Sequence, residues 1–366
     1  MPEPRRIVVE LGERAYPIVL GPLSGLGAQL AAGLSSVHRC VVVTNPVVGP
    51  LYLKQVVAAI QAEGWEVNTV EVIDGEQAKQ LSHYEQLIDD LLNTGLDRNT
   101  LVVALGGGVT GDLAGFAAAT VLRGLRLVQV PTSLLAMVDS SVGGKTGLNT
   151  SAGKNLVGAF HQPSLVQVDV SVLSTLSDRD FRSGLGEVVK HAVIADATFF
   201  AWLEENAEAI VRREVAVLSE IVARCCEIKA AVVARDEREA GERAVLNLGH
   251  TVAHALEAVS GFGVIPHGEA VGIGLVAEAV LGVERGWSHP EVPLRIAHIL
   301  TRFGLPTHAP PLPLNELQSA VSMDKKTRRG KMMMPVATAV GEVRLFEVLP
   351  EFLGGALRAA LGDRRS

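Results

Sequence analysis

The sequence is poor in aromatic residues and in cysteine. Only 4% of its 366 residues are Phe, Trp or Tyr, although 48% are hydrophobic, so small aliphatic side chains and glycine must build the core. Such a composition is typical of helices that pack closely on a parallel sheet. Three cysteines, two of them adjacent (Cys225 and Cys226), cannot form a disulfide framework, and a reducing compartment is expected.

The sequence also lacks an excess of positive charge, a signal-peptide core and a long apolar run. A net charge of -7 argues against nucleic acid or an anionic membrane as a partner. The opening residues, MPEPRRIVVE, contain no hydrophobic signal core. Apolar runs are interrupted by Asp112, Asp139 or Glu278 before they reach membrane-spanning length. A soluble, cytoplasmic protein is therefore expected.

The first half of the chain has an alternating strand and helix pattern, and the length suits two domains. Two short strands are expected first, at 6–10 and 16–20. Further strands are expected at 40–43, 67–73, 101–105, 127–130 and 166–168, with helices at 52–63 and 80–93. This alternation predicts an α/β domain, residues 1–177, with a mostly parallel, Rossmann-like sheet and helices on both faces.

From about Ser177 the pattern becomes helical. Helices are expected at 181–195, 198–234, 243–259, 268–285 and 291–303, and two short strands at 332–334 and 343–346. The predicted second domain, residues 178–366, is therefore essentially all-α. Residues 306–313 are expected to form a proline-rich loop and 362–366 a loose tail.

A histidine-rich segment is the first candidate for chemistry. His250 and His254 are four residues apart, so on a helix they share one face, and His267 follows shortly after. Neutral imidazole is a common ligand of divalent metals. Each ring could instead be an ordinary core histidine, but three in one apolar segment favour a metal site. Thr251 follows His250 where the metalloprotease motif requires glutamate, so peptide hydrolysis is not predicted.

Glu187 and Lys190 lie three residues apart in a segment that is apolar nearly all round. Such pairs are usually solvated surface bridges of little consequence. A helix apolar on all sides is buried, however, and buried charges need partners or a metal. Glu187 could complete a site with two of the histidines, which gives three protein ligands and one open position, as in catalytic zinc sites.

A glycine-rich turn joins the strand 101–105 to the helix that follows. Gly106-Gly-Gly108-Val-Thr-Gly111-Asp112 fits G-x-G-x-x-G, in which backbone N–H groups and the helix dipole can hold a pyrophosphate. The turn does not follow the first strand, and no acidic residue lies about 20 positions on, as an ordinary Rossmann domain has. A ribose contact upstream, in residues 74–79, is the candidate. A tight turn without a ligand is the alternative.

Several cations lie beside glycines or in expected loops. Arg123, Lys145 and Lys154 are next to glycines, and further cations follow in the second half at Lys229, Arg243, Lys325 and Lys326. Each alone could be an ordinary surface charge. Together, in an acidic protein, they indicate a small and highly anionic substrate.

These motifs together resemble the 3-dehydroquinate synthase family of the sugar-phosphate cyclases over nearly the whole chain. The stretches that carry the resemblance are DGEQAK (74–79), GGGVTGDLAGFAAAT (106–120), RG (123–124), VPTSLLAMVDSSVGGKTGLN (130–149), GKNLVGAFHQP (153–163), GLGEVVKH (184–191), RAVLNLGHTVAHALE (243–257), HGEAV (267–271) and DKK (324–326). The departures are small: Ser133 stands where the family often has threonine, and Met332-Met-Met334 replaces a more common aliphatic strand.

The resemblance implies one divalent ion, zinc or cobalt, held by Glu187, His250 and His267 in the helical domain. It therefore replaces the first expectation that His254 is a ligand, because this histidine would instead face the substrate phosphate and proton transfer. The resemblance also implies NAD as a cofactor of the α/β domain. The expected NAD contacts are Thr44, Asn45, Asp74, Glu76, Lys79, Gly107, Gly108, Gly111, Asp112, Thr132, Ser133, Leu135, Asp139, Lys145, Lys154, Thr175 and Leu176.

The remaining expected residues serve the substrate and the reaction. They are Arg123, Asp139, Lys145, Asn155, Lys190, Lys229, Arg243, Asn247, His254 and one of Lys325 and Lys326. The implied enzyme is a homodimer and a phosphate-eliminating lyase. It converts 3-deoxy-D-arabino-heptulosonate 7-phosphate to 3-dehydroquinate and phosphate by transient NAD-dependent oxidation, elimination, re-reduction and intramolecular aldol closure.

Three alternatives remain open at this point. Another sugar-phosphate cyclase would share the NAD and metal residues, but the cations at 229, 243 and 325–326 fit a substrate with a carboxylate better. A metal-dependent polyol dehydrogenase of the glycerol dehydrogenase type would not need so many phosphate-directed cations. A non-catalytic NAD-binding protein would have no reason to keep a full set of metal ligands.

Overall fold

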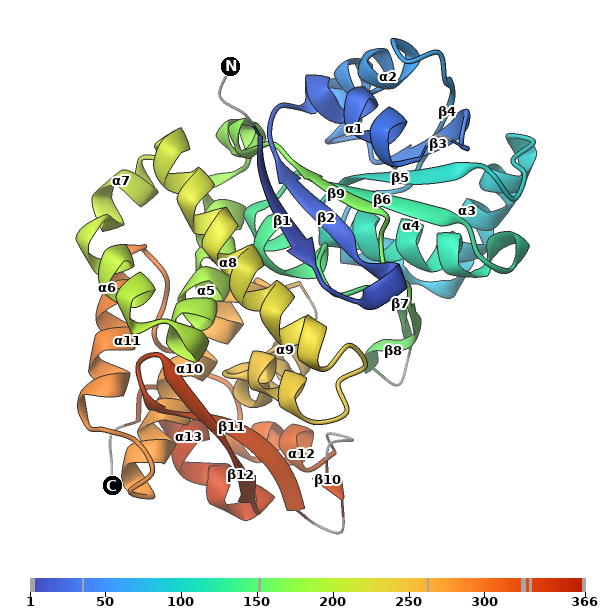
Figure 1. The fold of residues 1–366 in the computed structure, drawn as a ribbon. Helices are drawn as coiled ribbons and strands as arrows, with labels where there is room; N and C mark the ends of the chain where they lie inside the picture. Colours follow the sequence, from blue (N-terminus) through green and yellow to red (C-terminus); the bar gives the residue numbers. More distant parts are fainter. Residues whose placement is uncertain are drawn as a thin grey trace. The chain divides into compact units, whose positions relative to one another are not determined.

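The chain forms two compact units, each with its own core (Figure 1). The structure, a computed structural model, describes residues 4–34, 36–150, 153–261, 263–323, 327–328 and 331–363. The first unit contains the residues up to Leu176 together with Lys229–Ala234, and the second contains Ser177–Ile228 and the residues from Arg235 onward. The segment Lys229–Ala234 therefore brings one predicted substrate residue, Lys229, into the first unit.

The first unit is built on a seven-stranded sheet with the order β1-β2-β9-β6-β5-β3-β4. Only β1 and β2 pair antiparallel, and the other five neighbouring pairs are parallel. The strands are β1 (Arg5–Val9), β2 (Tyr16–Leu20), β3 (Arg39–Thr44), β4 (Glu66–Glu71), β5 (Leu101–Gly106), β6 (Arg126–Pro131) and β9 (Leu165–Val168). The predicted Rossmann-like, mostly parallel sheet is confirmed.

Valine-rich strands and helices with aliphatic side chains build the core of this unit, as the composition predicts. The helices are α1 (Leu26–Gly33), α2 (Lys54–Gln61), α3 (Leu81–Asn93) and α4 (Gly108–Thr120). Leu87 of α3 and Ala114 of α4 pack with Val41 and Val102 of the central strands in one buried cluster. Strands β3 and β5 are buried almost throughout, which is typical of a parallel sheet covered on both faces.

Two elements of the first unit were not predicted from the sequence. One is helix α1, and the other is an antiparallel hairpin of β7 (Lys145–Thr150) and β8 (Gly153–Phe160), which forms a separate two-stranded sheet. The hairpin is rich in glycine and small polar residues, so it lacks the apolar alternation that marks a strand. Its backbone is close packed, because a Cβ on Gly158 would lie 2.0 Å from the carbonyl oxygen of Thr146.

The strand order reverses between β3 and β5. From β3 the chain moves outward to β4, and then it returns to place β5 on the other side of β3. In open α/β sheets, ligands bind at the carboxyl ends of the strands at such a reversal. The predicted nucleotide residues Thr44 and Asn45 end or follow β3, and the glycine-rich turn at Gly107 and Gly108 follows β5. The topology therefore favours the same ligand site as the motif.

The second unit is helical and carries one small antiparallel sheet. Its helices are α5 (Asp178–Ala195), α6 (Ala197–Glu205), α7 (Ala207–Val211), most of α8 (Val215–Arg235), α9 (His250–Ser260), α10 (His267–Glu284), α11 (Glu291–Arg302), α12 (Leu314–Met323) and α13 (Gly354–Ala360). The sheet consists of β10 (Thr327–Arg328), β11 (Lys331–Ala339) and β12 (Glu342–Val348), in that order. The helical second half is confirmed, and the two strands expected there correspond to β11 and β12.

Two helix predictions in this unit are wrong in their extent. The single helix predicted at 198–234 is broken into α6, α7 and α8, at Asn206 and around Arg213, whose φ of 58° is not helical. The helix predicted at 243–259 begins only at His250, because Gly249 adopts a left-handed conformation with φ of 80°. Residues 242–247 form a 3-10 helix instead.

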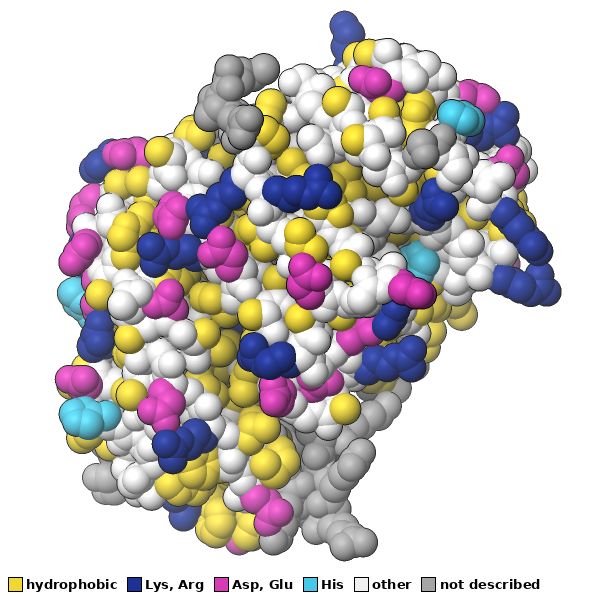
Figure 2. All heavy atoms as spheres, in the orientation of Figure 1, with side chains coloured by type: hydrophobic (Ala, Val, Ile, Leu, Met, Phe, Trp, Pro, Cys, Tyr) yellow, Lys and Arg dark blue, Asp and Glu magenta, His cyan; other side chains and the backbone are white. Residues whose placement is uncertain are grey.

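Within the described ranges, no helix is both long enough and apolar enough to cross a bilayer. On the face shown in Figure 2, acidic and basic side chains are interspersed, and neither sign of charge forms a continuous patch.

Two glycines of α1 provide a matched test of the packing in the first unit. A Cβ on Gly27 would lie 1.9 Å from the carbonyl oxygen of Ala59 in α2, whereas one on Gly33 would meet nothing within 4 Å. We expect Gly27→Ala to lower the free energy of unfolding by about 3 kcal/mol, since α1 must move. Gly33→Ala should leave it unchanged or raise it by up to about 1 kcal/mol. Urea denaturation measures both, and equal effects would contradict the α1–α2 contact.

Candidate metal and nucleotide sites

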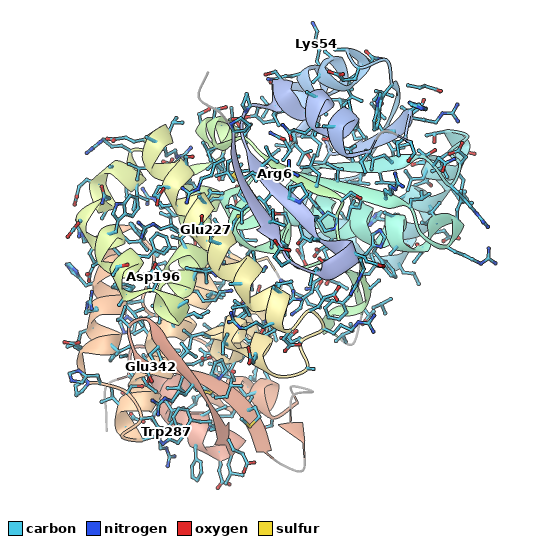
Figure 3. All side chains as sticks on the ribbon, viewed as in Figure 1. Arg6, Lys54, Asp196, Glu227, Trp287 and Glu342 are labelled. Atoms are coloured by element: carbon cyan, nitrogen blue, oxygen red, sulfur yellow. The ribbon has the colours of Figure 1, made fainter. Side chains whose placement is uncertain are left out.

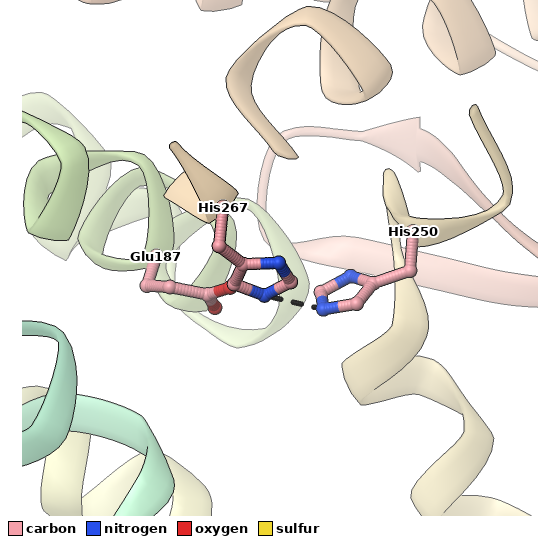
Figure 4. A group of neighbouring side chains, drawn as sticks. All are labelled: Glu187, His250 and His267. Carbon is pink, nitrogen blue, oxygen red and sulfur yellow. Dashed lines mark ion pairs between the residues drawn. The ribbon is translucent and has the colours of Figure 1, made fainter. Parts of the chain in front are cut away.

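Three side chains from three helices of the second unit converge on one point (Figure 4). Glu187 lies in the middle of α5, and His250 and His267 are the first residues of α9 and α10. The Nε2 atoms of His250 and His267 are 3.7 and 3.4 Å from Oε1 of Glu187. The donors around a tetrahedral ion with bonds of about 2.0–2.1 Å lie about 3.4 Å apart. The three side chains can therefore hold one divalent ion.

Both imidazoles turn the same nitrogen toward this point. Nδ1 of His250 lies 3.1 Å from the carbonyl oxygen of Leu248, and Nδ1 of His267 lies 3.4 Å from a carboxylate oxygen of Glu257. If Nδ1–H donates in each case, Nε2 of each ring faces Glu187 and is the nitrogen that would bind an ion. Glu257 is almost fully buried, and a carboxylate behind a ligating histidine is a common support in metal sites. Glu257 was not predicted from the sequence as a site residue.

Burial and neighbouring charges give the two rings opposite protonation. Burial, together with the charge of Lys190, holds the pKa of His250 well below its usual value. Burial also lowers the pKa of His267, but hydrogen bonds to Glu187 and Glu257 outweigh this effect and raise the pKa to about 10. At neutral pH His267 therefore carries a proton between two carboxylates, at a position where a divalent cation would compete with it.

The expected burial of the Glu187–Lys190 pair is confirmed. Nζ of Lys190 lies 2.5 Å from Oε2 of Glu187, and the two side chains are 1% and 0% exposed. A solvated surface bridge is thereby excluded. Removing one partner of a buried pair leaves an uncompensated charge in a medium of low polarity, which is far more costly than the loss of a surface bridge.

Glycine contacts fix the distance between α5 and α10 beside two of the candidate ligands. A Cβ on Gly186, next to Glu187, would lie 2.1 Å from the carbonyl oxygen of Gly268, next to His267. A Cβ on Gly268 would in turn lie 1.7 Å from the carbonyl oxygen of Ser183. Any larger residue would push the helices apart, so glycine at these two positions lets the backbones that carry the candidate ligands lie this close together.

The start of α9 has the same kind of contact with α10. A Cβ on Gly274 of α10 would lie 1.9 Å from the carbonyl oxygen of Gly249, the residue before His250. Gly249 also has φ of 80°, which disfavours any residue with a side chain. The backbones at all three candidate ligands are therefore fixed by contacts that only glycine permits.

The other candidate residues of the second unit lie near the start of α9. Asn247 donates to Oε1 of Glu239 at 2.5 Å, and Glu239 has an unusual φ of 58°. The buried guanidinium of Arg243 donates to the carbonyl oxygen of Glu237. Glu239 was missed by the sequence analysis, because neither its spacing nor its neighbours distinguish it from a surface carboxylate.

His254 is not a member of the ligand group. Its ring centroid lies 5.4 Å from that of His250, one turn earlier on α9, and its side chain is exposed. The first expectation of a ligand pair at His250 and His254 is therefore wrong, and the structure groups His250 with Glu187 and His267 instead. Lys325 and Lys326 lie outside the described residues.

In the first unit, the glycine-rich turn brings the start of α4 close to its neighbours. Gly107 is the N-cap of α4 and offers no side chain to cap it. A Cβ on Gly108 would lie 2.9 Å from Oγ of Ser140, and one on Gly111 would lie 2.8 Å from Oε1 of Gln129 in β6. The glycines thus permit close packing of helix on sheet, and they keep side chains away from the backbone N–H groups at the helix start.

A buried lysine links several predicted nucleotide and substrate residues. Nζ of Lys79 lies 2.6 Å from Oδ2 of Asp112 and 2.5 Å from Oδ1 of Asn155. Burial raises the pKa of Asp112, and Lys79 opposes this shift. Lys154 lies 3.9 Å from Glu76. The 3-10 helix at 76–79, the first turns of α4 and the β8 strand therefore form one polar cluster.

Two asparagine side chains extend this cluster. Asn45 donates to Oδ1 of Asp74 at 2.9 Å, and Asn149 donates to Oε1 of Glu76 at 2.7 Å. Oδ1 of Asn149 also accepts from the backbone N–H of Asn155 at 3.0 Å. Asn149 was not predicted as a site residue, since nothing in its local sequence indicates that it bridges two segments far apart in the chain.

The remaining predicted residues of the first unit lie in α8, in short helices or turns, and at or after the ends of strands. Lys229 contacts both the carboxylate and the backbone oxygen of Asp139, at 2.5 and 2.6 Å. Arg123 has φ of 69° in the turn before β6, and Lys145 begins β7. Thr132, Ser133 and Leu135 follow β6, and Thr175 and Leu176 end the segment after β9.

Comparison with known proteins identifies the family. Residues 69–183 match the N-terminal part of 3-dehydroquinate synthase and residues 184–327 match its C-terminal part. The 3-dehydroquinate synthase of Pelobacter propionicus is 45% identical over 350 residues, which cover 95% of this chain and 97% of that protein. The chain belongs to the 3-dehydroquinate synthase family.

Solved structures of sugar-phosphate cyclases confirm the fold of the family. A 2-deoxy-scyllo-inosose synthase, complexed with carbaglucose-6-phosphate, NAD+ and Co2+, aligns over 98% of this chain and 100% of its own with a TM-score of 0.88 at 24% identity. The 2-epi-5-epi-valiolone synthase of Streptomyces hygroscopicus, with NAD+ and Zn2+ bound, aligns over 96% and 97% with a TM-score of 0.86 at 27% identity.

The buried pair in α5 can be tested through stability. Glu187→Gln should lower the free energy of unfolding of the metal-free protein by about 3 to 5 kcal/mol, because Lys190 is left buried and charged. Lys190→Met should lower the free energy of unfolding by less. In this variant Glu187 still has a positively charged partner, the protonated ring of His267, whose Nε2 lies 3.4 Å from its carboxylate. Chemical denaturation of both variants and of the double variant measures the coupling. A larger loss for Lys190→Met than for Glu187→Gln would contradict this charge arrangement.

Proposed function

We propose that the protein is a phosphate-eliminating lyase that converts 3-deoxy-D-arabino-heptulosonate 7-phosphate to 3-dehydroquinate and phosphate. One observation carries the proposal: Glu187, His250 and His267 converge as a metal-ligand set in a chain that is 45% identical to a 3-dehydroquinate synthase. The family resemblance further leads us to propose a homodimer located in the cytoplasm.

Glu187, His250 and His267 would hold one divalent ion, zinc or cobalt. Two imidazole nitrogens and a carboxylate oxygen suit either metal and leave a position open for a substrate oxygen. The zinc of the related valiolone synthase supports this choice. When bound, the ion supplies Lewis-acid chemistry. Glu257 orients the His267 ring toward it, and Lys190 balances the charge of Glu187.

The first unit would hold NAD at the carboxyl ends of β3 to β6. The N-terminus of α4, at Gly107 and Gly108, suits the pyrophosphate, and Asp74 and Glu76 would accept hydrogen bonds from ribose hydroxyls. When bound, NAD+ supplies a hydride acceptor whose reduced form returns the hydride, so it is not consumed. Asp139, which contacts Lys229 at 2.5 Å, is the proposed residue on the nicotinamide side.

Buried cations suit a small substrate with two anionic groups. The side chains of Lys190, Lys229 and Arg243 are each almost fully buried, so each is held in one orientation before the substrate arrives. A planar guanidinium such as that of Arg243 matches a carboxylate in two hydrogen bonds. This favours a carboxylate-bearing substrate over the sugar phosphates of other cyclases. His254, exposed on α9, is the proposed contact to the phosphate and to proton transfer.

Turnover with a limiting amount of NAD+ tests the proposed reaction. The purified chain, loaded with Zn2+ or Co2+, is mixed with 3-deoxy-D-arabino-heptulosonate 7-phosphate and less than one equivalent of NAD+. We expect many phosphates released per NAD+ with no net absorbance of NADH, and loss of turnover after chelation. NADH that accumulates with glycerol, without phosphate chemistry, would instead indicate a polyol dehydrogenase.

Metal binding should release a proton from His267. Because its pKa is raised to about 10, the ring is protonated in the metal-free protein below that pH, and the ion must displace the proton from Nε2. The dissociation constant for Zn2+ should therefore fall about tenfold for each unit that the pH rises between about pH 6 and pH 9.

Calorimetry in buffers of different ionisation enthalpy counts the released protons. About one per ion is expected for the unmodified chain, and fewer for Glu257→Gln, in which His267 loses a negatively charged partner. A pH-independent affinity with no proton release would contradict the assigned protonation of His267.

A further inference from the structure

Glu278 is a buried acidic residue to which the proposed reaction assigns no role. It lies on α10, about three helical turns after the candidate ligand His267, and its side chain is 0% exposed. A carboxylate in such a position is costly unless hydrogen bonds compensate it. The hydrogen-bond partners of Glu278 therefore indicate why a carboxylate is buried at this position.

The carboxylate of Glu278 binds the start of α9. Its Oε2 accepts from the backbone N–H of Gly249 at 2.8 Å, and its Oε1 accepts from the backbone N–H of Val252 at 3.1 Å. These two N–H groups lie on either side of His250, the first residue of α9. The first N–H groups of a helix have no partner within the helix, and a negative charge there also interacts favourably with the helix dipole.

An ordinary N-cap is excluded at this helix start. A cap from residue 249 would need a side chain, but a Cβ on Gly249 would lie 3.0 Å from the backbone of Leu275 and of Val271 in α10, and its φ is 80°. Since α9 cannot cap itself at this residue, the acceptor comes from α10. The same helix thus carries one candidate ligand, His267, and binds the backbone on both sides of another, His250.

We propose that Glu278 is a positioning residue for the metal site, which sets where α9 begins and so where the ring of His250 stands relative to Glu187 and His267. The carbonyl oxygen of Leu248, which lies between the 3-10 helix at 242–247 and the start of α9, also accepts from Nδ1 of this ring. The inference rests on the proposed function in one respect, that Glu187, His250 and His267 hold a divalent ion.

Titration of the full, metal-free chain with Co2+, followed by visible absorption, tests the proposal. Glu278→Gln keeps the size of the side chain but turns an NH2 group toward one of the two N–H donors. We expect Co2+ to bind about 10 to 100-fold more weakly than in the unmodified chain, with an altered cobalt spectrum, which is the effect typical of residues that support metal ligands.

Asp196→Asn is the matched control. Asp196, labelled in Figure 3, also caps a helix of the second unit, since its carboxylate accepts from the backbone N–H groups of Thr198 and Phe199 at 3.0 and 2.9 Å. Asp196 directly follows the last residue of α5, whereas Glu187 lies in the middle of that helix. Asp196 touches no candidate ligand. This variant should lower the melting temperature and leave the affinity and spectrum of Co2+ unchanged.

Each outcome supports or overturns the proposed role of Glu278. Unchanged Co2+ affinity and spectrum in Glu278→Gln would overturn the proposal even if its melting temperature fell. If that variant does not fold, Glu278→Asp, which keeps the charge but withdraws it by one methylene group, is titrated in the same way, and unchanged binding again overturns the proposal. The metal site of the proposed function is wrong if the unmodified chain gives no cobalt band, or if the band persists in His250→Ala. This inference would then be wrong as well.

Discussion

The contact of α10 with the backbones of α5 and α9 is the constraint on which the candidate site depends. Glycines at 186, 268, 249 and 274 let these helices meet at distances that no other residue permits, and each of the three candidate ligands is next to one of these contacts. Because the ligands come from three different helices, their mutual distances are set by helix packing, not by local conformation. The interior is close packed, so a shift of one helix would move a donor by more than a metal bond tolerates.

Charge is the second constraint, because the site gathers several ionisable groups out of water. The carboxylate of Glu187 is balanced by Lys190 and by the protonated ring of His267, whose pKa is raised to about 10. A divalent ion would take the place of one proton on His267. Polar groups in the first unit are satisfied in a similar way, through the cluster of Lys79, Asp112 and Asn155. In both units, buried polar partners thus hold the candidate site residues in fixed positions.

Local patterns allowed much of the fold to be predicted, and long-range contacts explain what was missed. Strands such as 101–105 and helices such as 181–195 have clear apolar patterns, whereas the β7–β8 hairpin is glycine-rich and has none. The break at Arg213 depends on one left-handed residue in an otherwise helical pattern. The three candidate ligands were predicted by resemblance, whereas spacing alone favoured His254, which lies outside their group. Glu257, Glu278 and Asn149 could not be found in this way, because their roles depend on partners far away in the chain.

The proposed metal site requires that Glu187, His250 and His267 share one cation. Anomalous diffraction at the zinc absorption edge, from crystals of the zinc-loaded chain, tests it most directly. We expect a single strong peak about 2.0–2.2 Å from Nε2 of both histidines and from a carboxylate oxygen of Glu187. A peak bound elsewhere, or one that leaves any of these three side chains beyond bonding distance, would contradict it.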